Sequence, residues 1–205
     1  MKISLSDIGK RFGREWIFRH FTQTFTPGET YAITGPNGSG KSTLLQIVGG
    51  ALVPSEGQID WASSERTVDT ENAYRHLSLA APYLEVIEEM TLEEFLNFHA
   101  GFKPWFSGLR TEEVMDSIGL TQAKAKQIRY FSSGMKQRVK LAQAIFSDTS
   151  TLLLDEPCTN LDKKGFELYH QLIAQYTEHR LVIVSSNDPA EYDFCKTVLS
   201  IGDYR

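Results

Sequence analysis

Residues 35–42, with the sequence GPNGSGKS, have the types and spacing that bind phosphate. They match the pattern G-x-x-x-x-G-K-[S/T] in full. Glycines let backbone N–H groups point inward at phosphate oxygens, in a conformation that side chains would block. Lys41 can neutralise β- and γ-phosphates, and the Ser42 hydroxyl can be a ligand of Mg²⁺. We therefore predict a nucleotide-binding loop, with contacts from Gly35, Pro36, Asn37, Gly38, Ser39, Gly40, Lys41, Ser42 and Thr43.

A second chemical feature is the pair of carboxylates, Asp155 and Glu156, that ends the apolar segment 151–156. Ligands gather at the carboxyl ends of parallel strands, where Asp155 could hold Mg²⁺ directly or through water. Glu156 could polarise an attacking water. A surface turn would have the same sequence, but beside a phosphate loop the pair indicates catalysis. We predict Glu156 and Lys41 as catalytic residues, and Asp155 and Ser42 as metal ligands.

The elements that position these residues follow from the pattern of apolar runs. Short apolar runs at 29–34, 151–156 and 181–186 alternate with helix-like stretches such as 166–176. Runs that are apolar on both faces and alternate with helices predict buried parallel strands. The sequence therefore indicates an α/β fold in which the phosphate loop and the acidic pair each follow the carboxyl end of a buried strand.

The middle of the chain is predicted to be helical. Thr91 and Glu94 form a Thr-x-x-Glu capping box, which predicts the start of a helix. Further helix-like pieces follow, so we interpret approximately residues 85–148 as a helical subdomain inserted in the α/β core. Its aromatic residues Phe102, Trp105 and Phe106 are expected to pack inside this subdomain.

Length and composition limit the classes of protein that remain. The 205 residues, with 41% hydrophobic and 23% charged side chains, predict one globular domain spanning 1–205. The net charge of −5 argues against general nucleic-acid binding. Two cysteines form no disulfide framework, which fits a reducing compartment. The apolar runs are far shorter than the roughly 20 residues of a membrane span, so any membrane role is expected to need a partner.

In the order of its motifs, the sequence resembles the ATP-binding cassette (ABC) ATPases over nearly its whole length. The phosphate loop GPNGSGKST and the acidic strand LLLDEP match the usual sequences of that family's motifs. Between them, residues 131–138 (FSSGMKQR) are similar to the family signature LSGGQ-x-x-R, with Phe131, Ser133 and Met135 as departures. Residues 160–162 (NLD) resemble the end of the family's D-loop. The resemblance implies a P-loop NTPase of ABC type, with a mostly parallel core sheet, N-terminal antiparallel strands and an inserted helical subdomain.

The resemblance also implies a site shared by two cassettes packed head to tail, as a homodimer or with a paralogous cassette. Each ATP would lie between one phosphate loop and the signature of the other subunit. The signature residues acting in trans would be Ser132, Ser133, Gly134 and Met135, with Asp162 in the D-loop. Alternatively, Ser132 or Ser133 could simply cap the helix that follows. Family members stack adenine on an aromatic residue near the N-terminus, which Phe12 matches, with Trp16 as second choice and core packing as the alternative for both.

Two residues expected from the family are absent. A glutamine that normally reaches towards Mg²⁺ and the attacking water is replaced by Ala81 or Pro82. A histidine that normally touches the γ-phosphate is replaced by Asn187, whose amide can donate a hydrogen bond but carries no charge. We therefore expect slow hydrolysis by the isolated chain.

Together these features predict an ATP-binding and ATP-hydrolysing subunit that powers transport through a separate membrane permease. ATP and Mg²⁺ would be the cofactors, and the chain would sit on the cytoplasmic face of the membrane with no span of its own and no direct contact with nucleic acid. A patch around Tyr83, Leu84, Ile87 and Met90 would receive the permease. The alternatives are a soluble ABC ATPase acting on nucleic acid or ribosomes, and a regulatory ATP-binding switch with little turnover. Neither the transported substrate nor the direction of transport follows from the sequence.

Overall fold

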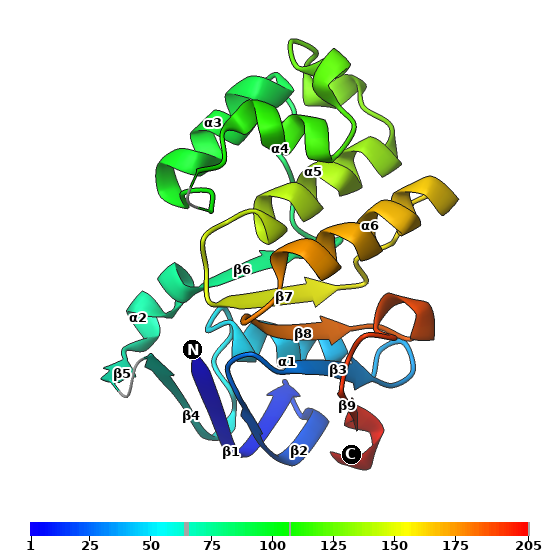
Figure 1. Ribbon diagram of the computed structural model, residues 1–205. Coiled ribbons are helices and arrows are strands. Elements are labelled where there is room, and N and C mark those ends of the chain that lie inside the picture. Colours follow the sequence, from blue (N-terminus) through cyan, green and yellow to red (C-terminus); the bar gives the residue numbers. More distant parts are fainter. Residues whose placement is uncertain (64–65, 107, 205) are drawn as a thin grey trace. The chain divides into compact units, whose positions relative to one another are not determined.

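The computed structural model describes residues 1–63, 66–106 and 108–204, which form a mixture of strands and helices (Figure 1). The strands are β1 (Lys2–Phe12), β2 (Glu15–Phe25), β3 (Thr30–Thr34), β4 (Glu56–Ser63), β5 (Arg66–Val68), β6 (Leu77–Ala80), β7 (Thr151–Asp155), β8 (Leu181–Ser185) and β9 (Thr197–Ser200). The α-helices are α1 (Lys41–Val48), α2 (Thr70–Ala73), α3 (Leu92–Phe102), α4 (Thr111–Ser117), α5 (Ser133–Ile145) and α6 (Lys163–Tyr176). The three predicted strands at 29–34, 151–156 and 181–186 are confirmed as β3, β7 and β8.

The strands form two sheets. A four-stranded sheet has the order β2-β1-β4-β5, and its pairings are antiparallel. A five-stranded sheet has the order β6-β7-β8-β3-β9, in which β3 pairs in parallel with β8 and β9, and β7 pairs in parallel with β8. The expected mixture of a parallel core sheet and N-terminal antiparallel strands is confirmed. Because β7, β8 and β3 are parallel neighbours, the residues after their carboxyl ends meet at one edge.

The first compact unit comprises Met1–Leu79, Thr149–Glu156 and His179–Arg205, and it contains both sheets and α1. Its core joins the buried face of the β1–β2 hairpin to α1 and to the strands of the parallel sheet. The apolar positions of α1, predicted from their helical spacing, are buried here. This packing fixes the start of α1, and with it the phosphate loop, between the two sheets. The core residues contributed by these elements include Ile3, Leu5, Phe18, Phe21, Ile33, Leu44, Leu45, Ile47, Leu153 and Ile183.

The second compact unit comprises Ala80–Asp148 and Pro157–Glu178 and contains α3, α4, α5 and α6. The predicted capping box at the start of α3 is present: the Glu94 N–H donates to Thr91 Oγ1, and the Thr91 N–H donates to the Glu94 carboxylate. Each of these bonds satisfies a backbone N–H group that has no backbone partner at the start of the helix. The helical character predicted for the middle of the chain is therefore present in this unit.

The aromatic residues of the middle segment do not all pack as expected. Trp105 is buried and stacks on His99 with ring centroids 5.1 Å apart, and Phe106 stacks near Tyr176. The expectation is wrong for Phe102, whose side chain is 75% exposed at the end of α3. Phe102 lies one turn beyond the exposed Phe98, and the two rings contact each other rather than the core.

Candidate nucleotide-binding site

The phosphate loop connects β3 to α1, as its sequence predicts. Gly38 and Gly40 have φ angles of 76° and 101°, in the left-handed region that favours glycine. Gly40 also has no room for a side chain, because a Cβ there would lie 2.5 Å from Ile17 Cγ2. The two glycines therefore allow the loop to curl tightly and to deliver the chain into the first turn of α1, whose N–H groups are free to bind an anion.

Lys41 is the first residue of α1 and is 5% exposed. Its ammonium group donates to the carbonyl of Gly35 over 2.9 Å and approaches the carbonyl of Pro36. These contacts hold the positive charge inside the curl of the loop. The charge is thus placed where a bound phosphate would neutralise it.

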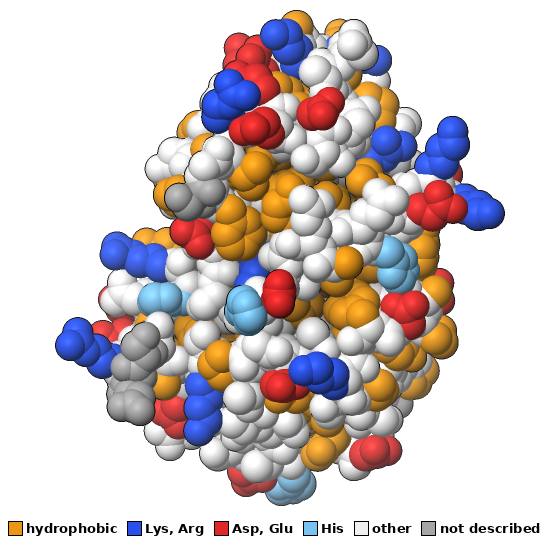
Figure 2. Space-filling view, in the orientation of Figure 1, with side chains coloured by type: hydrophobic (Ala, Val, Ile, Leu, Met, Phe, Trp, Pro, Cys, Tyr) orange, Lys and Arg blue, Asp and Glu red, His pale blue; other side chains and the backbone are white. Residues whose placement is uncertain are grey.

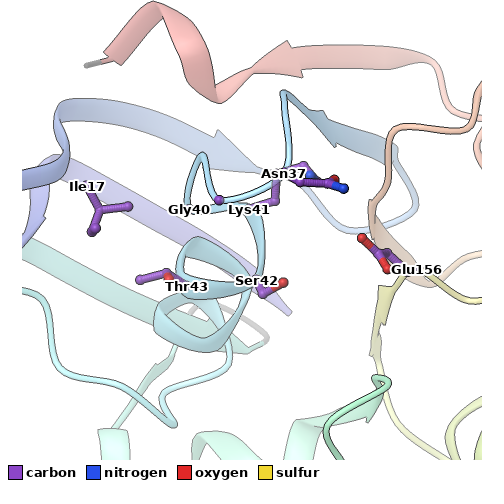
Figure 3. Close-up of a pocket in the computed structure, with 8 residues that line it drawn as sticks. Ile17, Asn37, Gly40, Lys41, Ser42, Thr43 and Glu156 are labelled. Carbon is purple, nitrogen blue, oxygen red and sulfur yellow. The ribbon is translucent and has the colours of Figure 1, made fainter.

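A cavity of about 230 Å³ opens along this loop. Figure 3 shows the hydroxyl of Ser42 and the carboxylate of Glu156 directed into the space between them. Ile17, from β2, forms an apolar wall that sequence reasoning did not predict. In the sequence, Ile17 is only an apolar residue within a strand, and its partial burial in the structure does not distinguish it from core residues either. The residues that line the cavity are Ile17, Asn37, Gly38, Gly40, Lys41, Ser42, Thr43 and Glu156.

Glu156 has an unusual backbone conformation directly after β7. Its φ angle is 42°, and its N–H donates to the carbonyl of Ser185 at the end of β8 over 2.8 Å. A non-glycine residue in this region costs about 1–3 kcal/mol and persists only where its surroundings hold it. Such strain is typical of functional positions, and here it directs the carboxylate into the cavity.

Asp155 differs from Glu156 because it is buried, at 1% exposure. Within the described residues its Oδ1 accepts no hydrogen bond, and the same is true of the hydroxyl of Ser185, its register partner on β8. A buried carboxylate oxygen with no donor is costly unless a cation or water satisfies it. With the Ser42 hydroxyl, this all-oxygen donor set is of the kind that Mg²⁺ binds, so these residues fit the ion.

The predicted adenine contact, Phe12, is 53% exposed at the end of β1, where Lys10 lies over its ring. A second cavity, of about 240 Å³, is lined by Trp16 and Ile17 and does not include Phe12. It shares Ile17 and Gly38 with the first cavity, so the two form neighbouring parts of one groove. Phe12 and Trp16 both lie at the turn end of the β1–β2 hairpin, but only Trp16 lines this groove, and the choice of Phe12 stays a prediction.

The signature segment lies in the second unit, at the start of α5. Ser132 is the N-cap, and its hydroxyl accepts the N–H of Met135 over 3.2 Å. Ser133 is the first residue of α5. Gly134 closely approaches the D-loop, because a Cβ on Gly134 would lie 3.0 Å from the carbonyl oxygen of Asn160. Asp162 caps α6 through the N–H of Gly165.

Sequence reasoning did not predict the role of Gln137 in this segment. Its side chain is buried, and Nε2 donates to the carbonyl of Pro157 over 2.7 Å. This bond joins the signature helix to the segment that leads from Glu156 to the D-loop residues 160–162, within one unit. The signature and the D-loop therefore form one connected surface.

The glutamine position of the second unit is apolar, as the sequence indicates. Ala81 is fully buried and Pro82 is exposed, and neither has a side chain that could bind a metal. Pro82 contributes only its carbonyl, which accepts a hydrogen bond from Lys140.

The parallel sheet carries a glycine-rich loop that enters a helix, and a lysine lies inside that loop. An acidic pair lies at the end of β7, which β8 separates from β3 in the sheet. These features together define a P-loop nucleoside triphosphatase fold. The family model described as "ABC transporter" matches residues 18–159, and the chain belongs to this family. Membership of the family implies ATP binding and hydrolysis.

Three comparisons illustrate the similarity. The chain is 33% identical over 178 residues to the lipoprotein-releasing system ATP-binding protein LolD of Bacteroides fragilis, covering 83% of this chain and 82% of that protein. It is 29% identical to the cytochrome c biogenesis ATP-binding export protein CcmA of Rhizobium meliloti, covering 98% of this chain and 99% of that protein. A solved dimeric bacterial ABC transporter cassette has the same fold, with a TM-score of 0.81 at 24% identity, covering 98% of this chain and 95% of the cassette.

The chain does not cover the full length of all the relatives that it matches. It covers 55% and 57% of the length of two uncharacterised ABC transporter ATP-binding proteins of Bacillus subtilis, at 28% and 29% identity.

Proposed function

We propose that this chain is the ATP-binding and ATP-hydrolysing subunit of a transporter whose membrane permease is a separate protein. The observation that supports this most directly is the loop cavity lined by Lys41, Ser42 and Glu156, in a chain of the ABC transporter family. Relatives named as export and lipoprotein-releasing ATP-binding proteins support the transport role. The cytoplasmic face of the membrane is the location that this role requires.

In the proposed reaction, the phosphate loop and Lys41 hold the β- and γ-phosphates of ATP. Bound Mg²⁺, held by Ser42 and Asp155, would offset negative charge on the phosphates. Glu156 accepts the proton of the water that attacks the γ-phosphate, which leaves ADP and phosphate. The strained backbone of Glu156 supports this role, because it keeps the carboxylate directed at the cavity.

The site is proposed to be completed by a second cassette packed head to tail. The capped start of α5, with Ser132, Ser133, Gly134 and Met135, would bind the γ-phosphate of the other subunit through hydroxyl and N–H groups. Met135 does not prevent this, since the contact depends on serine and backbone. The D-loop, tied to α5 through Gln137, would move with it. Asp162 would hold the end of the D-loop in place, because its side chain caps the start of α6.

A permease contact is proposed at the segment after β6 in the second unit. Tyr83 and Ile87 are large hydrophobic side chains with 45% and 39% exposure, and Leu84 and Met90 are partly exposed beside them in sequence. Exposed apolar side chains of this kind mark interaction surfaces more often when they are clustered. Figure 2 shows hydrophobic side chains open to solvent on the face it displays. Among the described residues, no helix is long and apolar enough to cross a membrane.

Ile87→Glu tests the transporter role. We expect the wild-type chain to fractionate with membranes in its own cells, and Ile87→Glu to move to the supernatant, because a buried unpaired charge opposes docking. The purified variant should keep its ATPase rate, since Ile87 lies outside the loop cavity. Val53→Glu is the matched control, because Val53 is 75% exposed in the first unit. Fractionation of the wild-type chain with ribosomes would overturn the transporter role in favour of the nucleic-acid alternative, which no feature of the described residues favours.

A further inference from the structure

The side chain of Asn187 bridges two residues of the phosphate loop. Its Oδ1 accepts the N–H of Gly35 over 3.2 Å, and its Nδ2 donates to Asn37 Oδ1 over 3.0 Å. Both bonds join the segment after β8 to the loop after β3, within the first unit. Asn187 therefore uses its carbonyl oxygen and one of its two N–H groups on the loop.

Strand register explains why Asn187 can reach the loop. Ile33 on β3 pairs with Ser185 on β8, so the residues two positions further along each strand, Gly35 and Asn187, emerge side by side. The turn that carries Asn187 is itself fixed. The N–H of Asp188 donates to Ser186 Oγ, and the Asp188 carboxylate caps the N–H of Ala190. Asn187 is thus held in place before any ligand arrives.

The residue type matters because asparagine has an acceptor and a donor on the same carbon atom. One short side chain can therefore hold a backbone N–H and a neighbouring amide together. The bridged residue Asn37 lines the loop cavity, and Figure 3 shows its amide pointing out of the loop, on the side where Glu156 lies. Fixing Gly35 and Asn37 restricts the curl of the loop from its first residue to its tip.

We propose that Asn187 is a positioning residue that holds the phosphate loop in its binding shape, so that it sets the affinity for ADP as well as ATP. This inference rests on the proposed ATP-binding function and concerns the same site. A loop that is held in its binding shape binds more tightly, because binding then requires less ordering. A residue that only touched the γ-phosphate would instead affect ATP alone, because ADP lacks that group.

The test is a double-mutant cycle with Asn187→Ala, Asn37→Ala and the double variant, measured as dissociation constants for both ADP and ATP. Each hydrogen bond contributes about 0.5–1.5 kcal/mol, so we expect each single variant to weaken ADP and ATP binding alike by about three- to tenfold. The double variant should be no weaker than the poorer single variant, because both substitutions break the same bridge. Asn72→Ala, on an exposed position of α2, is the control and should bind as the wild type does.

Two results would overturn the proposal. One is loss of ATP affinity with unchanged ADP affinity in Asn187→Ala, which would make Asn187 a γ-phosphate ligand. The other is additive losses in the double variant, which would mean that Asn37 and Asn187 act separately. Failure of the wild-type chain to bind either nucleotide would instead contradict the proposed function itself. The melting temperature of each nucleotide-free variant should stay near that of the wild type, since both side chains are exposed.

Discussion

Glu156→Gln is expected to lower the ATPase rate at least about 100-fold, because an amide cannot accept the proton of the attacking water. Glutamine has nearly the same shape, so the strained backbone and the N–H bond to Ser185 should be kept. ATP binding should therefore remain, and dimers should accumulate in the presence of ATP because hydrolysis no longer separates them. Phosphate release and gel filtration with ATP measure the two effects.

The matched control for this experiment is Glu167→Gln, which removes an exposed carboxylate from α6 and should leave the rate unchanged. A Glu156→Gln variant that kept a tenth or more of the wild-type rate would show that another group accepts the proton. If the wild-type chain alone had no turnover while still binding ATP, the permease or a different second cassette would have to supply what Ala81, Pro82 and Asn187 lack.

Lys41→Met is expected to weaken ATP binding about 10- to 100-fold, since a charge-assisted hydrogen bond contributes about 1.5–3 kcal/mol. Methionine keeps an apolar stem of similar length in the loop, so the fold should be retained. The loss has two sources. The phosphates lose a cation, and the carbonyl of Gly35 loses the donor that holds the loop in the absence of nucleotide.

Titration with a fluorescent ATP analogue measures this effect, with Lys163→Met at the exposed start of α6 as the control for loss of a lysine. Equal affinities for Lys41→Met and wild type would contradict the assignment of the loop as the phosphate site.

The parts of the fold that depend on local pattern could be predicted from the sequence. Apolar runs placed β3, β7 and β8, and the Thr91 capping box placed the start of α3. The phosphate loop has a sequence that is specific to its backbone shape, because few residue types tolerate its curl.

Other parts of the candidate site depend on contacts between distant segments, and these could not be predicted. Ile17 reaches the loop only because the β1–β2 hairpin folds over α1. The bridge from Asn187 to Gly35 depends on the register between β3 and β8, which one sequence does not specify. The exposure of Phe102 depends on where α3 ends relative to the core of its unit.

The proposed site combines the phosphate loop of one cassette with the signature of a second, which a homodimer of this chain would supply. The direct measurement is the ATPase rate of a mixture of Lys41→Met and Gly134→Asp, each of which we expect to be inactive alone because it lacks either the loop lysine or a working signature. Random pairing gives about half heterodimers, each with one intact site, so the mixture should recover about a quarter of the wild-type rate. A mixture no more active than the separate variants, with heterodimers demonstrated, would contradict a shared site.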